Sequence, residues 1–292
     1  MALFQAPTKD SGKAPSAAVL LEAGGYPARI VRIVDLGKQP GSVQFPEPVY
    51  KMAMTFELLD EFMKEVDANG QIIMVQDPDG EPGEMMGKNL EDKPRWFDFE
   101  FTYNPDGFMG DRSHIYKLMQ SVDAFEVAPN PAAGIPGHPA KQLNELLGEP
   151  LIVNLTQYVK KSGKNAGEPA NKISTFAPMK SKEKREAKPL VNPTVYFDLG
   201  ESDLEAFNKL PGGDSPYSFK AKILSNLDFS GSKLDVLLNG ANAGKPAANA
   251  PMENKASDAE VDEALRAEME AQRIAKEQAA ASGEAAPSNI PF

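Results

Sequence analysis

Two stretches of this sequence alternate strictly between apolar and polar residues, and this pattern constrains the fold more than any other feature. In Trp96–Tyr103 (WFDFEFTY), three phenylalanines and a tyrosine fall on one side of an extended chain, and polar residues with Trp96 fall on the other. In Tyr50–Leu58 (YKMAMTFEL), large apolar residues alternate with Lys51 and other small or polar residues. A period of two is typical of a β-strand with one buried face. The two stretches therefore predict neighbouring strands of a sheet that covers a core.

Three further segments have the composition of β-strands, and a helix is expected between the third and fourth strands. Ala28–Leu36 is rich in β-branched residues, while Leu151–Lys160 and Lys172–Ala177 flank a loop rich in Gly, Lys and Asn. Ser113 is placed to cap a short helix whose apolar residues recur at helical spacing. Five antiparallel strands with a helix in this place are the plan of the OB fold. We therefore expect a mainly β protein with minor α content, built on a five-stranded, OB-fold-like antiparallel barrel.

Composition divides the chain into a barrel region and three other regions, with an insertion inside the barrel. The insertion is an acidic segment, rich in Gly and Pro, between the second and third strands. After the barrel, a segment with a helical capping pattern is expected to pack on it as an extension. The end of the chain has the Ala, Asn, Gly and Pro content of a linker. The expected regions are a flexible N-terminus (1–23), the barrel domain (24–190, with the acidic insertion at 64–94), the extension (191–237) and a disordered acidic tail (238–292).

Charge is distributed unevenly along the chain. The net charge of −11 opposes binding to phosphate, but residues 160–188 contain nine basic and three acidic residues, a local charge of +6. The distribution of cations matters more than their sum for contact with a nucleic acid backbone. This segment, the basic strip, spans the loop between the fourth and fifth strands, which OB folds use to contact oligonucleotides. The alternative interpretation is a solvated loop with no partner.

The barrel face opposite the core is expected to combine basic and aromatic side chains. If the phenylalanines of strands two and three lie in the core, residues of the opposite parity face solvent. Single strands are held by cations that follow the phosphates and rings that stack on bases. Asp98 and Glu100 share the face of Trp96 and repel phosphate, and the alternative for each ring is packing under a loop or the extension. The candidate DNA-binding residues are Lys51, Trp96, Tyr158, Lys160, Lys161, Lys164, Lys172, Phe176 and Lys180.

No pattern in the sequence favours catalysis. There is no cysteine, so disulfides and thiolate metal ligands are excluded. The carboxylates of Asp98, Glu100, Asp106 and Asp111 leave a metal-dependent nuclease as an alternative. However, no Lys or His lies at a suggestive spacing, and phosphate-binding loops, nucleophile elbows and zinc signatures are missing. We therefore expect no enzyme activity, cofactor or metal site. Without an apolar run for a signal peptide or membrane span, we expect a cytoplasmic location.

Several segments, taken in order, resemble phage-encoded single-stranded DNA-binding proteins. The similarity covers roughly residues 24–230 in patches, and the order of the patches indicates it more than any single patch. The resemblance implies an OB-fold domain that binds single-stranded DNA, in the host cytoplasm if the protein is phage-encoded. The matching segments are Pro27–Gly37, Tyr50–Asp60, Gly148–Asn154, Asn171–Ser174 and Tyr196–Leu199.

The last three residues form the most specific short motif in the chain. Ile290, Pro291 and Phe292 are similar to the tip of bacterial single-stranded DNA-binding proteins, which docks replication and repair enzymes. The resemblance implies that these three residues bind a polymerase, helicase or nuclease. The bacterial tip has aspartates directly before this motif, whereas Ser288 and Asn289 stand there in this chain.

These observations lead to one expected function and two alternatives. We expect a single-stranded DNA-binding protein that coats and protects DNA in replication, recombination and repair, and that recruits partners through its C-terminal tip. A strand-annealing or recombination mediator protein is the alternative within this class. A phage structural or assembly protein with a β-rich core is the alternative from another class. The sequence leaves open the oligomeric state, including a homo-oligomer, and the preference for DNA over RNA.

Overall fold

The computed structural model divides the chain into two units, residues 1–244 and 245–292, and all described residues lie in the first unit. The described unit is mainly antiparallel β-sheet with a few short helices, in agreement with the expected fold class. No helix among the described residues is long and apolar enough to cross a membrane. The described residues are 16–41, 46–105, 109–110, 112–127, 138–139, 141–161, 165–201, 203–212 and 215–240.

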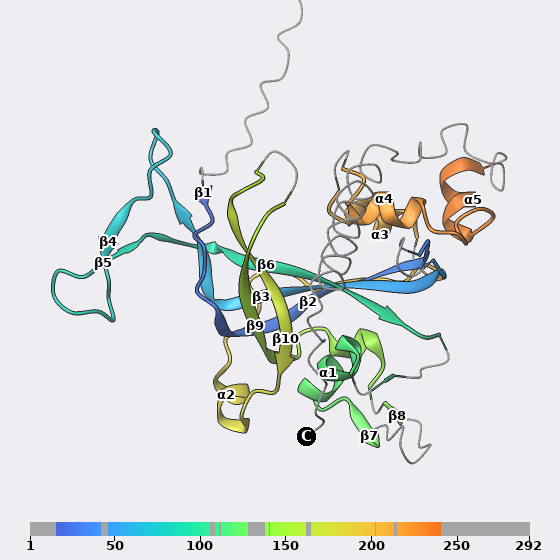
Figure 1. Cartoon of the computed structure of the whole chain (residues 1–292), viewed down its shortest axis with the longest axis horizontal. Coiled ribbons are helices and arrows are strands. Elements are labelled where there is room, and N and C mark those ends of the chain that lie inside the picture. Colours follow the sequence, from blue (N-terminus) through green and yellow to red (C-terminus); the bar gives the residue numbers. More distant parts are fainter. Residues whose placement is uncertain are drawn as a thin grey trace, which may run out of the picture. The chain divides into compact units, whose positions relative to one another are not determined.

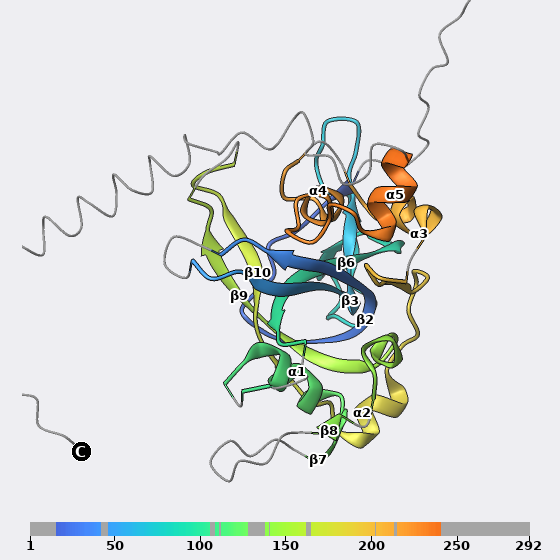
Figure 2. The same ribbon diagram turned by 90° about the vertical axis from the view of Figure 1, so that its right-hand side faces the viewer.

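One curved sheet organises the described unit (Figures 1 and 2). Its five main strands pair with their neighbours in the order β6-β3-β2-β9-β10, and every pair is antiparallel. Two short strands complete the sheet: β1 (Ser16–Ala17) pairs with the end of β3, and β11 (Val195–Phe197) pairs in parallel with β2. The main strands are β2 (Gly24–Gln39), β3 (Val49–Glu65), β6 (Asn89–Tyr103), β9 (Pro150–Val159) and β10 (Pro169–Ala177).

Hydrogen bonds among the described residues do not close the sheet into a barrel. Among the described residues, no hydrogen-bonded ladder joins the edge strands β6 and β10. Side chains connect the two edges instead: the ring of Phe176 on β10 lies 5.4 Å from that of Phe99 and 5.5 Å from that of Phe101 on β6. The sheet therefore curls so that aromatic side chains of its two edge strands pack against one another.

A strap of backbone before β2 also links the two edges. On the β6 side, the guanidinium of Arg95 donates a hydrogen bond to the carbonyl of Val19 at 2.5 Å. On the β10 side, the amide of Asn171 exchanges two hydrogen bonds with the backbone of Leu21, at 2.8 and 2.9 Å. Leu21 is buried in the core. The end of the segment that was expected to be flexible is thus held to the sheet.

The inner face of the sheet encloses the larger of two hydrophobic clusters, and α1 (His114–Ser121) covers one end of it. The expected helix cap is confirmed, because Ser113 Oγ accepts a hydrogen bond from the backbone N–H of Tyr116 at 3.2 Å. Ile115 and Leu118 are buried against the sheet, as their helical spacing predicts. The remaining short elements near this end are β7 (Phe125–Val127), β8 (His138–Pro139) and the 3-10 helix η2 (Leu143–Leu146).

The outer face of β2 and β3 is covered by the C-terminal extension. Val34, Leu36 and Ala53 pack there in a second hydrophobic cluster with residues of the extension. Every residue of β3 from 52 to 59 is consequently buried, so the expectation that the second parity of this strand faces solvent is wrong. The helices of the extension are α3 (Leu204–Lys209), α4 (Phe219–Leu224) and α5 (Lys233–Asn239).

A buried carboxylate fastens the beginning of the extension to the sheet. Glu57 on β3 is buried, and it accepts hydrogen bonds from the backbone N–H of Val191 at 2.6 Å and from the side-chain amide of Asn192 at 2.8 Å. Three hydrogen bonds to a carboxylate satisfy a charge that would otherwise be costly to bury. The extension is therefore anchored by polar contacts as well as by apolar packing.

The acidic insertion is largely a continuation of the β3–β6 strand pair. β3 runs on to Glu65 and β6 begins at Asn89, and between them β4 (Met74–Gln76) pairs with β5 (Met85–Gly87). These two strands form a hairpin within the insertion. The segment thus forms an arm at one end of the sheet (Figure 1).

Candidate nucleic-acid interface

The β9–β10 hairpin brings together several of the candidate DNA-binding residues. Along β9, Leu151, Val153 and Leu155 are buried, and this alternation turns the residues between them outward. In the antiparallel register, Lys172 lies opposite Thr156. Directly paired residues share one face of a sheet, so outward residues of both strands form a single surface.

Tyr158 and Lys172 form a pair on this outward surface. The Lys172 Nζ lies 5.4 Å from the centroid of the Tyr158 ring, within the range of a cation–π contact. Tyr158 is 40% exposed and Lys172 is exposed. An exposed ring offers a stacking surface to a base, and the neighbouring ammonium offers a charge to a phosphate. The two predicted residues are therefore brought together in an arrangement suited to one nucleotide.

Two further candidate lysines lie where β9 runs into the hairpin loop. Lys160 is 3.6 Å from the carboxylate of Glu168, an ion pair at the surface that contributes only about 0–1 kcal/mol and that a phosphate can replace. Lys161 is exposed. The loop closes through a hydrogen bond from Gly167 N–H to the Lys160 carbonyl at 2.8 Å, with Gly167 at a φ of +88° that favours glycine. The candidate Lys164 lies outside the described residues.

Phe176 does not belong to this surface, and the prediction that it lies on the outward face is wrong. The register shifts between Ile173, which pairs with Leu155, and Thr175, which pairs with Asn154. This β-bulge reverses the alternation, since one extra residue moves every following side chain to the other face. Phe176 is consequently only 6% exposed and packs in the core.

The basic strip is divided in space. Its second half forms α2 (Ser181–Glu186), which lies at the opposite end of β10 from the hairpin loop (Figures 1 and 2). There Lys184 pairs with Asp123, and Lys188 lies 2.7 Å from Asp60, whose hydrogen bond raises the pKa of the lysine. The candidate Lys180 precedes this helix, so the structure does not bring it together with the hairpin lysines.

Lys51 and Trp96 lie on a third surface, the outer face of β3 and β6 beside the extension. Lys51 Nζ is 4.0 Å from Glu100, and the Trp96 ring is covered on one side by the guanidinium of Arg32, 5.1 Å from the ring centroid. Sequence reasoning missed Arg32. An arginine inside an apolar strand was the available signal, because a buried guanidinium needs partners.

The carboxylates that suggested a nuclease are occupied by other contacts or lie outside the described residues. Asp98 accepts a hydrogen bond from Thr55 Oγ1 at 2.5 Å, and Glu100 pairs with Lys222. Asp106 and Asp111 are not among the described residues. Within the described ranges, no three His, Asp or Glu side chains are grouped so that they could hold a metal ion.

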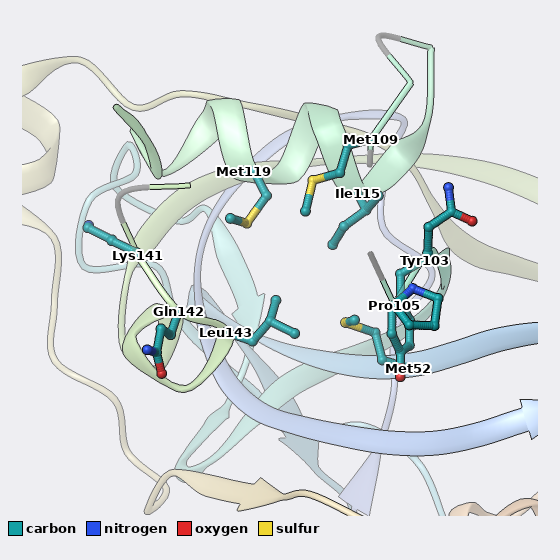
Figure 3. A pocket seen from close by; sticks show the side chains of 10 residues that line it. Met52, Tyr103, Pro105, Met109, Ile115, Met119, Lys141, Gln142 and Leu143 are labelled. Carbon is teal, nitrogen blue, oxygen red and sulfur yellow. The ribbon is translucent and has the colours of Figure 1, made fainter. Parts of the chain in front are cut away.

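A small apolar pocket of about 230 Å³ lies between α1 and η2 (Figure 3). Its walls include Met52, Met109, Ile115, Met119 and Leu143, which point toward one another in the close-up. The ammonium group of Lys141 on its rim is bound to Glu149 at 2.7 Å. Tyr103, Asn104 and Gln142 contribute the other polar side chains of its lining.

No family model, curated protein or solved structure matches the chain.

Proposed function

We propose that this protein is a non-enzymatic, single-stranded DNA-binding protein that coats and protects DNA during replication, recombination and repair. The observation that carries the proposal is the exposed Tyr158–Lys172 pair, with Lys160 and Lys161 beside it on the β9–β10 hairpin. Stacking on an exposed ring is tolerant of sequence because every base has a π-face. This surface therefore suits sequence-independent binding of a single strand better than recognition of a particular base pair.

The sheet supports an OB-fold-like architecture for this domain. β2, β3, β6, β9 and β10 follow one another along the chain with α1 between the third and fourth strands, as the OB plan requires. We propose that the barrel is closed by side chains, through Phe176 and the strap at Leu21, instead of by a ladder. In this arrangement the β9–β10 loop is one of the two loops that flank the binding face of OB folds.

The net charge of −11 does not oppose the proposal strongly at physiological salt. Charges at a protein surface are screened beyond about 8–10 Å at this ionic strength. The cations close to the bound DNA therefore decide its affinity, and on the described part of the hairpin these are Lys160, Lys161 and Lys172. The acidic arm at residues 64–94 lies on the β3–β6 pair, a different part of the sheet from the hairpin.

We also propose that Ile290, Pro291 and Phe292 recruit replication or repair enzymes. This part of the proposal rests on the sequence alone. These residues, like all of 241–292, lie outside the described residues. The described part of the chain ends just after α5.

A gel-shift titration of the full chain with labelled oligo-dT tests the proposed function. We expect a shifted complex with oligo-dT and a much weaker one with a duplex of equal length, because stacking requires unpaired bases. Size-exclusion chromatography without DNA belongs to the same experiment. If oligo-dT is not shifted and the protein elutes as a large assembly, a structural or assembly role replaces DNA binding.

A further inference from the structure

The outer face of β6 carries the single tryptophan of the chain. Trp96 is 39% exposed. One face of its ring is occupied by the Arg32 guanidinium at 5.1 Å. Tryptophan rings are buried to a large extent on average, so a ring that is fixed by a contact on one face and otherwise open to solvent is uncommon.

Arg32 is held in an unusual way. It is only 7% exposed, and its guanidinium lies 5.1 Å from the Trp96 ring and 5.7 Å from the ring of Phe219, the first residue of α4. Its Nη1 donates a hydrogen bond to Thr55 Oγ1 at 3.3 Å, while its buried Nε has no hydrogen-bond partner among the described residues. Burial lowers the pKa of Arg32, and the negative charge of Asp98 counteracts that effect. An arginine remains charged at any ordinary pH, so the two rings hold a buried cation between them.

The acidic residues on this face do not repel phosphate as strongly as the sequence indicates. Asp98 lies near Arg32 and accepts the hydrogen bond of Thr55 at 2.5 Å. Glu100 is paired with Lys222 of α4 and with Lys51 at 4.0 Å. The two carboxylates are therefore balanced by three cations: Arg32 of β2, Lys51 of β3 and Lys222 of the extension. Repulsion of phosphate by this face is thus no longer an objection to Trp96 as a DNA-binding residue.

We propose that Trp96 is a second stacking site for an unpaired nucleobase, and that Arg32 is the positioning residue that fixes its ring. α4 completes the site, since Phe219 packs on the far side of Arg32 and Lys222 neutralises Glu100. Lys51 lies farther along the same face, opposite Thr102 and six residues along β6 from Trp96, and pairs with Glu100 at 4.0 Å. The extension is thus a part of the DNA-binding surface as well as a cover for the sheet. This inference rests on the proposed function and extends it to a surface separate from the hairpin.

The intrinsic fluorescence of the full chain reports on this site directly, because Trp96 is its only tryptophan. We expect oligo-dT to quench this emission as it binds, and an abasic oligonucleotide of the same length to bind more weakly without quenching it. Trp96→Ala should lower the affinity for oligo-dT by about 5- to 150-fold, and Trp96→Phe by much less, because it keeps a ring. Tyr196→Ala is the matched control: Tyr196 is also 39% exposed but lies on β11, and its loss should leave the affinity unchanged.

Arg32→Met separates a positioning role from a structural one. The variant keeps an unbranched side chain between the rings but removes the charge, so we expect weaker binding of oligo-dT and unchanged binding of the abasic strand. An equal loss for both strands would show that Arg32 only supports the fold. If anisotropy shows oligo-dT binding while the emission of Trp96 stays constant, the stacking site is refuted and the proposed function stands. Absence of any oligo-dT binding would refute the proposed function itself.

Discussion

Replacing Phe176 with alanine should lower the free energy of unfolding by about 3–5 kcal/mol, the cost of removing a buried phenylalanine from a packed core. The ring centroid of Phe176 lies 5.1 Å from that of Phe56. The same ring packs against Phe99 and Phe101 and so joins the two edges of the sheet. A folded unit of this size loses about 2–4 °C of melting temperature per kcal/mol. Thermal unfolding followed by circular dichroism should therefore show a decrease of about 6–20 °C.

The control for this variant is Val159→Ala on the neighbouring strand. Val159 is exposed, so shortening it should leave the melting temperature nearly unchanged. A Phe176→Ala protein that melts like the wild type but binds oligo-dT poorly would contradict the core position. It would place the ring on the DNA-binding surface instead.

Replacing Tyr158 with alanine should have the opposite profile. We expect the affinity for oligo-dT to fall by about 5- to 150-fold, equivalent to the roughly 1–3 kcal/mol that stacking of one base contributes. The melting temperature should change by little, because the ring is 40% exposed and lies beside the exposed Lys172. Fluorescence anisotropy of a labelled oligonucleotide at one fixed salt concentration measures the affinity.

Tyr158→Phe distinguishes stacking from hydrogen bonding by the phenol. This variant keeps the ring, so its affinity should remain close to that of the wild type. Unchanged affinity in Tyr158→Ala would show that the strand does not stack on the hairpin. A large fall in its melting temperature would show that the ring supports the fold.

Local sequence patterns correctly predicted the core-facing side of β6 and the cap of α1. The alternation in β6 places its phenylalanines toward the core because a strand has a strict period of two and its core side is uninterrupted. Ser113 caps α1 because capping depends on residues only three positions apart. Such features are encoded within a few residues, so they can be read from one sequence.

The candidate site was predicted less completely. The errors in predicting it come from irregular backbone geometry and from contacts between residues far apart in the sequence. A bulge between Ile173 and Thr175 leaves no clear mark in the sequence, yet it moves Phe176 from the surface to the core. Glu57 has the appearance of a solvent-facing residue, but Val191 and Asn192, more than a hundred residues later, cover it. No local pattern encodes contacts of this kind.

The salt dependence of oligo-dT binding tests the central claim most directly. Each phosphate neutralised on a single strand contributes about −0.7 to the slope of log affinity against log salt. Changing Lys160, Lys161 and Lys172 together to alanine should therefore make the slope shallower by about 2. The control variant removes the same charge by changing Lys88, Lys182 and Lys209 to alanine. These three lysines lie away from the hairpin and pair with nearby acidic residues. We predict a shallower slope only for the hairpin variant; equal slopes in the wild type and both variants would contradict DNA binding on the β9–β10 hairpin.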